Sequence, residues 1–308
     1  MHSVKSKPQS ASRFMTPGVD GFGFQDHPDA FSPEQAKAWI IPFGFEKTVS
    51  YGGGTHRGPA MAIRASHEVE MFDEYTWDEP FYDYGVATFR EPEIPQDHQA
   101  ALDMLTAYVQ ETVDAGKFPL TIGGEHSITP GAIKPLVEKY PNLTILQFDA
   151  HGDLRDEFRG DKLSHANAMR RCLDNPDVNL VAVGIRSISR DEIPYWEENQ
   201  SRIKTFFAKD KRSWTPEQIA EAVGTGPVYI TFDIDAFDSS LMPATGTPEP
   251  GGLFWDDALD ILEAVTKRAQ IVGADVVELA PHEAHHACDY ITAKLIYKIL
   301  TMSLAKGC

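Results

Sequence analysis

The chain has little of three features, and each shortage excludes a class of protein. Its 308 residues hold only 3 cysteines, too few for a disulfide framework, and their odd number is typical of a reducing compartment. No apolar run reaches the roughly 18 residues that a membrane-spanning helix needs. Basic residues are scarce too, since 28 Lys and Arg stand against 46 Asp and Glu, a net charge of −18. We therefore expect a cytoplasmic protein that binds neither nucleic acid nor anionic membranes.

What the chain does have is a regular alternation of short apolar runs and amphipathic stretches. Residues 1–36 hold Ser, Pro, Gly and Asp without a sustained period, which predicts an N-terminal arm. Beyond it, strands are expected over residues 38–43, 118–122, 143–148, 180–185, 228–232 and 271–277. Helices are expected over residues 58–72, 98–115, 164–173, 215–223, 256–269 and 289–305. Such alternation is typical of an α/β protein with three α-β-α layers and a mostly parallel central sheet, so residues 37–308 are predicted to form a single domain.

Side chains that could bind metal follow three of the predicted strands. His126 follows the strand over residues 118–122. Asp149, His151 and Asp153 follow the strand over 143–148, and Asp233 and Asp235 follow the strand over 228–232. The carboxyl ends of parallel strands share one edge of a sheet, where such folds bind ligands. Four crowded carboxylates repel each other, and two divalent cations would balance them. A lone Asp-x-Asp is more often a helix cap, but three motifs together favour a binuclear site. Oxygen and nitrogen ligands suit Mn²⁺, with Ni²⁺, Co²⁺ or Zn²⁺ as alternatives.

Five motifs carry a resemblance to a known family, and they lie at residues 123–127, 148–154, 232–238, 243–248 and 275–281. Together they resemble the ureohydrolase family of arginases and agmatinases, and the resemblance runs from about residue 37 to about residue 303. The sequence departs from the family at Glu125, where arginases usually carry Asp, and at Gly152, where many members carry Thr. Neither position supplies a metal-ligating side chain in that family.

The resemblance implies two Mn²⁺ ions per chain and hydrolysis of a guanidinium to urea and an amine. It assigns the first ion to His126, Asp149, Asp153 and Asp233, and the second to His151, Asp149, Asp233 and Asp235, so that two aspartates bridge. Glu278 matches the family carboxylate that pairs with the guanidinium, and His165 matches the histidine proposed as proton shuttle. The family forms trimers or hexamers, which implies a homo-oligomer here.

The loop of residues 154–165 bears on the choice of substrate. It lacks the Asn and Ser pattern with which arginases hold the amino-acid end, and it resembles agmatinase-type members instead. The ammonium of agmatine could meet the acidic side chains of Asp156, Glu157 or Asp161. The carboxylate of 4-guanidinobutyrate could instead meet Arg155 or Arg159. We expect hydrolysis of agmatine to putrescine and urea, with guanidinobutyrate, guanidine or arginine as alternatives. A mononuclear zinc deacetylase fits less well, because it would not need both His126 and Asp235. An inactive homologue fits less well, because all six ligand positions, Glu278 and His165 are filled.

Overall fold

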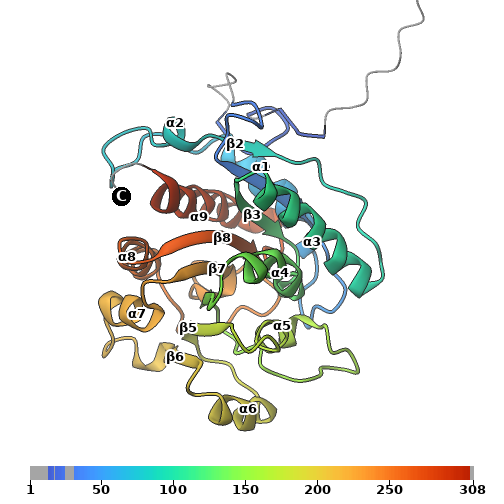
Figure 1. Ribbon diagram of the computed structural model, residues 1–308, viewed down its shortest axis with the longest axis vertical. Helices are drawn as coiled ribbons and strands as arrows, with labels where there is room; N and C mark the ends of the chain where they lie inside the picture. The colour runs from blue at the N-terminus through green and yellow to red at the C-terminus, as the bar shows by residue number, and fades with distance from the viewer. Residues whose placement is uncertain (1–12, 17, 25–30, 306–308) are drawn as a thin grey trace, which may run out of the picture.

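A computed structural model describes residues 13–16, 18–24 and 31–305. Its centre is an eight-stranded sheet in which all neighbouring strands pair in parallel (Figure 1). The strands lie in the order β2 (Val86–Thr88), β1 (Ala38–Phe43), β3 (Phe118–Gly123), β8 (Gln270–Val277), β7 (Pro227–Asp233), β4 (Thr144–Phe148), β5 (Asn179–Ile185) and β6 (Ile203–Phe207). This confirms the predicted α/β class and the parallel sheet.

The six predicted strands are present, and the two that the sequence pattern missed are β2 and β6, at the opposite edges of the sheet. The first has only three residues. The second is half-exposed along most of its length and carries the exposed Lys204. An edge strand is covered on fewer sides than a central one, so it needs no continuous apolar run. A search for such runs therefore finds only the inner strands.

Helices cover both faces of the sheet and complete the three predicted layers (Figure 1). One hydrophobic core packs the sheet against α1 (Gly58–Ser66), α2 (Phe81–Tyr84), α7 (Pro216–Val223), α8 (Trp255–Thr266) and α9 (His286–Leu304). The other packs it against α3 (His98–Asp114), α4 (Thr129–Lys139), α5 (Ala168–Cys172) and α6 (Ile193–Glu198). Across residues 13–16, 18–24 and 31–305, no helix has the length and apolar character needed to cross a membrane.

Several helices differ from the prediction, and α2, α4 and α6 have no predicted counterpart. The helix expected over residues 58–72 ends at Ser66, whose hydroxyl bonds back to the carbonyl of Ile63. The helix expected over residues 164–173 is instead a 3-10 turn followed by α5, because Asn167 leaves the helical backbone conformation. Helix α4 was not predicted, since its sequence contains two prolines and a glycine. One proline lies in the first turn, where a missing N–H costs nothing, and Gly131 lets the helix pass close to the backbone of α3.

The predicted arm lies partly outside the described residues, as do the last three residues of the predicted domain. The described part of the arm packs against the edge of the sheet near β2. Phe14 forms an isolated antiparallel bridge with Phe89, and the two rings stack with centroids 4.5 Å apart. Phe22 is also buried. The boundary between arm and domain after residue 36 stays a prediction.

Candidate active site

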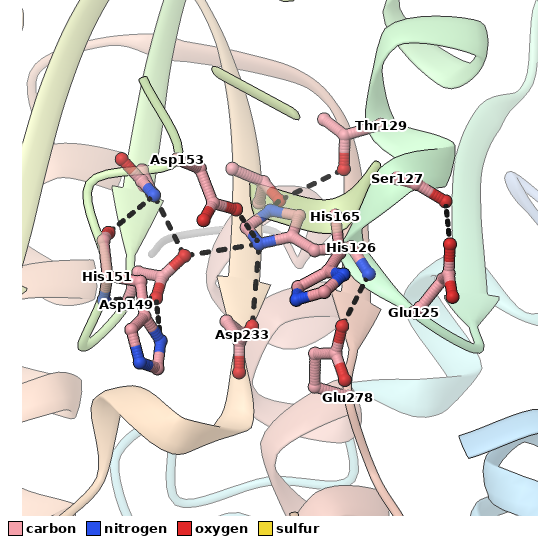
Figure 2. Close-up of polar contacts among 12 residues, drawn as sticks. Glu125, His126, Ser127, Thr129, Asp149, His151, Asp153, His165, Asp233 and Glu278 are labelled. Atoms are coloured by element: carbon pink, nitrogen blue, oxygen red, sulfur yellow. Dashed lines mark hydrogen bonds and ion pairs between the residues drawn. The ribbon is translucent and has the colours of Figure 1, made fainter. Parts of the chain in front are cut away.

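The carboxyl ends of strands β3, β7 and β4 bring the six predicted metal ligands together. Figure 2 shows His126, Asp149, His151, Asp153 and Asp233. The chain leaves β4 into Asp149, His151 and Asp153, leaves β7 into Asp233 and Asp235, and leaves β3 into His126. Asp153 turns back toward the others through a left-handed backbone with φ 53°. That conformation costs aspartate less than most residues.

The ring of His126 is the centre of the cluster. Its Nδ1 atom lies 3.1 Å from Asp149 Oδ2, 3.2 Å from Asp153 Oδ2 and 3.4 Å from Asp233 Oδ2. This nitrogen is buried and forms no regular hydrogen bond. A buried ring nitrogen that faces three carboxylates is the arrangement expected of a metal ligand, because a cation between these atoms would satisfy all four.

A second group adjoins the first and shares Asp149 with it. The Nδ1 atom of His151 lies 2.9 Å from Asp235 Oδ2 and 3.5 Å from Asp149 Oδ1. In each group the potential ligand atoms lie within 4.8 Å of one another. The described residues therefore hold two adjacent sets of side chains that fit divalent cations.

The charges of the cluster are strongly perturbed. Burial raises the pKa of Asp153 to about 7, and repulsion from Asp149 adds to the shift. Burial and the neighbouring Asp235 likewise raise the pKa of Asp233 well above its usual range. Burial alone would raise the pKa of Asp149 too, but the neighbouring imidazoles of His126 and His151 lower it. Without cations the cluster must hold extra protons, which divalent ions would displace.

Glu278 lies beside the cluster, just after β8. Its backbone adopts φ 67°, a left-handed conformation that is strained for a residue other than glycine. The backbone N–H of His126 donates to its Oε1 atom at 2.7 Å. Burial, followed by repulsion from Glu125, raises the pKa of the Glu278 carboxyl well above its usual range. Such a carboxylate is stabilised by any cation placed next to it.

His165 opens the 3-10 turn His165–Asn167 and belongs to neither group of potential metal ligands. Its Nδ1 atom lies 3.0 Å from Thr48 Oγ1, and its Nε2 atom lies 3.0 Å from Ser50 Oγ. Burial lowers the pKa of the imidazole, so the ring is neutral at pH 7. Together with Glu278 and five of the six predicted ligands, all but Asp149, His165 lines a small inner cavity.

An outer cavity of about 320 Å³ adjoins the inner one. The two share five lining residues, which are Ser50, His151, Asp153, His165 and Thr247. Arg155 lines the outer cavity, 3.9 Å from the exposed Asp191. Two of the acidic side chains expected to meet an ammonium face elsewhere: Asp156 pairs with Arg171 at 2.7 Å, and Asp161 lies 3.4 Å from His98.

The sequence reasoning missed the side chains behind the cluster. Thr231 Oγ1 lies 2.9 Å from His126 Nε2 and donates to Asp275 Oδ1 at 2.6 Å. The sequence did carry a signal for Thr231, because it stands two residues before Asp233 on the same strand face. Asp275 begins one of the motifs quoted above, but its role was not assigned.

Arg186 was missed as well. Its guanidinium donates to backbone carbonyls on both sides of the loop that carries Asp235, among them Asp235 O at 2.7 Å and Phe237 O at 3.1 Å. It also bonds to the carbonyls of Glu249 and Pro250, so it ties the two segments together. A lone arginine after a strand has no pattern that would reveal this role.

The sequence matches the arginase family over residues 36–304. It is 36% identical over 270 residues to N(1)-aminopropylagmatine ureohydrolase of Synechocystis sp., covering 85% of this chain and 87% of that protein. It is also 36% identical over 271 residues to agmatinase of Bacillus anthracis, covering 85% and 88%. Among solved structures, agmatine ureohydrolase of Thermoplasma volcanium superimposes with a TM-score of 0.80 at 27% identity, covering 94% of each chain. The chain therefore belongs to the arginase family and is a hydrolase of guanidino compounds.

Proposed function

We propose that the chain hydrolyses agmatine to putrescine and urea at a binuclear manganese centre. The observation that carries the proposal is the inner cavity, where Glu278 and His165 face the His and Asp cluster. A planar guanidinium binds best to a two-oxygen acceptor. Glu278 is such an acceptor, it is buried, and no Lys or Arg of residues 13–16, 18–24 and 31–305 forms an ion pair with it.

The metal ligands we propose are those that the family resemblance implies: His126, Asp149, Asp153 and Asp233 for one ion, and His151, Asp149, Asp233 and Asp235 for the other. Bound there, the pair would supply an activated water at neutral pH. The Nδ1 atom of His126 supports this arrangement, because it is buried, faces three carboxylates and forms no regular hydrogen bond with them.

The chain's own groups then have two roles. Glu278 holds the guanidinium with its carbon toward the cluster. His165, which is partly buried and neutral, takes a proton from the attacking water and returns it to the leaving amine. Both roles need only contacts across the inner cavity, which these side chains line.

The relatives support agmatine as the substrate. The curated relatives named above are an agmatinase and an aminopropylagmatine ureohydrolase, and each is matched over more than four fifths of both chains. Agmatine has a guanidinium at one end and an ammonium at the other. The guanidinium would enter the inner cavity, and the tail would lie in the outer one.

A second candidate is a guanidino acid such as 4-guanidinobutyrate, and Arg155 favours it. This side chain lines the outer cavity and lies over the ring of Phe158, with 5.0 Å from the guanidinium carbon to the ring centroid. Its ion-pair partner Asp191 is largely exposed, which makes that pair weak. Apart from the proposed metal ligands, the other charged side chain of this cavity is Glu192. It already accepts hydrogen bonds from the backbone N–H groups of Leu154 and Ser189. The tail of the substrate would therefore meet a positive charge.

The experiment is a urea-release screen of the purified chain with agmatine, 4-guanidinobutyrate, arginine and guanidine, after loading with Mn²⁺ or Ni²⁺. The highest kcat/KM is expected for agmatine. A higher value for 4-guanidinobutyrate would establish the second candidate, and no urea from any substrate would overturn both.

Arg155→Glu separates the two candidates, with Arg159→Glu as its matched control. The guanidinium carbon of Arg159 also lies over the Phe158 ring, 4.9 Å from its centroid, but Arg159 does not line the outer cavity. If the tail is an ammonium, Arg155→Glu raises kcat/KM for agmatine. If the tail is a carboxylate, it lowers kcat/KM for 4-guanidinobutyrate by about tenfold or more, the effect of losing a hydrogen bond to a charged group.

We further propose that the chain forms a homo-oligomer, a trimer or hexamer, in the cytoplasm. Supporting features are the apolar side chains on the surface, such as Trp77, which is 77% exposed and packs edge-on against Phe72. The buried Cys172 and Cys288 are both free thiols, consistent with a reducing compartment. Light scattering after size-exclusion chromatography tests the oligomer, and a monomer would contradict it.

A further inference from the structure

Hydroxyl groups hold the imidazole of His165 on both sides. Thr48 Oγ1 lies 3.0 Å from Nδ1 and accepts the backbone N–H of the same histidine, also at 3.0 Å. Ser50 Oγ lies 3.0 Å from Nε2. Ser164 Oγ lies farther away, at 3.3 Å from Nδ1. The positions of the hydroxyl protons therefore decide which ring nitrogen carries hydrogen.

Glu125 decides the position of the Thr48 proton. The Glu125 side chain is buried and accepts four hydrogen bonds. The Thr48 hydroxyl donates to Oε1 at 2.8 Å and the Ser127 hydroxyl at 2.6 Å, and the backbone N–H groups of Lys47 and Thr48 donate to Oε2 at 2.7 and 2.5 Å. A carboxylate with two donors on each oxygen is a saturated acceptor and has no proton to give.

The Thr48 hydroxyl determines which ring nitrogen of His165 carries hydrogen. Thr48 has one hydroxyl proton, and it is committed to Glu125. The oxygen of Thr48 can then only accept, so its 3.0 Å contact with His165, shorter than the 3.3 Å contact of Ser164, is a hydrogen bond when Nδ1 carries the hydrogen. Nε2 is left with its lone pair and accepts from Ser50, which lines both cavities.

We infer that Thr48 and Glu125 are positioning residues that hold His165 as its Nδ1–H tautomer, with Nε2 and the Ser50 hydroxyl forming the proton path to the substrate. The inference deepens the proposed function and rests on it for the reaction, but not for the tautomer. In other proton-transferring histidines a carboxylate bonds the ring directly and fixes its tautomer and orientation. Here Glu125 fixes the tautomer of His165 through the Thr48 hydroxyl.

The proton transfers balance in the following way. Hydrolysis adds water to a guanidinium cation and yields urea and an alkylammonium. A bond forms between the water oxygen and the guanidinium carbon while one water proton passes through Ser50 to Nε2. When the carbon–nitrogen bond to the alkyl chain breaks, Nε2 returns that proton to the leaving nitrogen. The proton that remains on the former water oxygen passes to the same nitrogen as the carbonyl of urea forms, which gives the alkylammonium. His165 ends unchanged.

Magic-angle-spinning ¹⁵N NMR of the full-length, metal-free chain with labelled histidine tests the tautomer directly. Subtracting the spectrum of His165→Gln assigns the His165 signals. We expect Nδ1 to be the protonated nitrogen. A protonated Nε2 with bare Nδ1 would overturn the inference, and this measurement needs no catalytic activity.

Two substitutions at Thr48 form a matched pair. Thr48→Ser keeps the hydroxyl and should preserve the tautomer and kcat. Thr48→Val keeps the shape but removes the acceptor, so the Nε2–H tautomer should appear and kcat should fall by about 10²-fold, the usual size of a lost proton-transfer group, with KM and metal content unchanged. A merely structural role would instead lower stability and metal content without changing the tautomer. Thr48→Val with the wild-type tautomer and kcat would contradict the inference.

Glu125→Gln provides an independent check, because an amide can donate a hydrogen bond where the carboxylate only accepts. The donated bond would turn the Thr48 hydroxyl toward Nδ1 and favour the Nε2–H tautomer. If the wild-type chain shows the Nδ1–H tautomer but releases no urea from any guanidino substrate, the proposed function fails and the tautomer assignment survives. If it releases urea but shows the Nε2–H tautomer, the assignment alone fails.

Discussion

The ring of His126 donates its Nε2–H to Thr231 Oγ1 at 2.9 Å. The direction of this bond is set by Asp275, which accepts the Thr231 proton at 2.6 Å. Asp275 is itself held by hydroxyls of Thr129 at 2.9 Å and Tyr229 at 2.8 Å. Thr231 therefore holds the ring with Nδ1 turned toward the carboxylates, and Nδ1 is the nitrogen that a metal would bind in place of a proton.

Thr231→Val should weaken metal binding by about 10- to 100-fold, the usual effect of losing a group that orients a ligand. Valine fills the same volume but leaves the Nε2–H of His126 without an acceptor, so the ring can rotate or change tautomer. Thr231→Ser, which keeps the hydroxyl, is the control. Competition with a chelator measures the affinity, and equal affinities for the two variants would contradict the proposed orientation.

Asp233→Asn should remove both ions and abolish activity. One Asp233 oxygen lies 3.4 Å from His126 Nδ1, and the other accepts the backbone N–H of Asp235 at 2.8 Å, so this carboxylate touches both halves of the cluster. An amide has no charge to balance two cations. Elemental analysis of the metal-loaded variant is the measurement. Two ions per chain with normal turnover would show that Asp233 does not bridge.

The site could be predicted to the extent that its side chains follow inner strands. Asp149, Asp233 and His126 come directly after apolar runs, and the sheet brings the ends of those runs together. Side-chain alternation also indicates Thr231, which shares a strand face with Asp233. Asp275 could have been inferred from the same argument on β8.

The rest of the site could not be predicted, because it comes from segments without a period. Thr48 and Ser50 lie in the irregular chain between β1 and α1, and their position depends on contacts with Glu125, far away in the sequence. The fold shows the same division. Inner strands were found by their apolar runs, whereas the edge strands β2 and β6 are short or half-exposed.

Lys298 forms a buried ion pair outside the His and Asp cluster, and we expect its loss to lower the free energy of unfolding. Lys298 of α9 is completely buried, and its ammonium lies 2.5 Å from Asp73 and 2.9 Å from Glu74. Lys298→Met leaves Asp73 buried without its partner, so the free energy of unfolding should fall by about 3–5 kcal/mol. Lys267→Met, which removes only an exposed pair with Glu263, should cost less than about 1 kcal/mol. Urea unfolding at pH 7 compares the two, and equal losses would contradict the difference.

The same pair predicts a pH dependence. Burial by itself raises the pKa of Asp73, but the ammonium of Lys298 and the backbone N–H groups of Thr76 and Tyr75 together outweigh it, and the pKa in the folded chain lies below the usual value. A carboxyl whose pKa is lowered on folding adds stability above its unfolded pKa of about 3.9, and that stability is lost as the pH falls through the folded value. The stability difference between the wild type and Lys298→Met should therefore be largest near pH 7 and shrink as the pH falls and Asp73 takes up a proton. A difference that grows on acidification would have the wrong sign.

His165→Ala should lower kcat by about 10²-fold or more and leave the metal content intact, because the imidazole transfers a proton without binding an ion. The side chain lines both cavities and contacts Thr48 and Ser50, but it is in neither group of potential metal ligands. If the ring shuttles protons, imidazole added to the buffer should enter the vacated space and restore part of kcat. The rescue should follow the titration of free imidazole, rising as the neutral base forms. If the ring only supports the turn His165–Asn167, the variant should lose thermal stability and imidazole should restore nothing. An alanine variant with wild-type kcat would exclude His165 from the reaction.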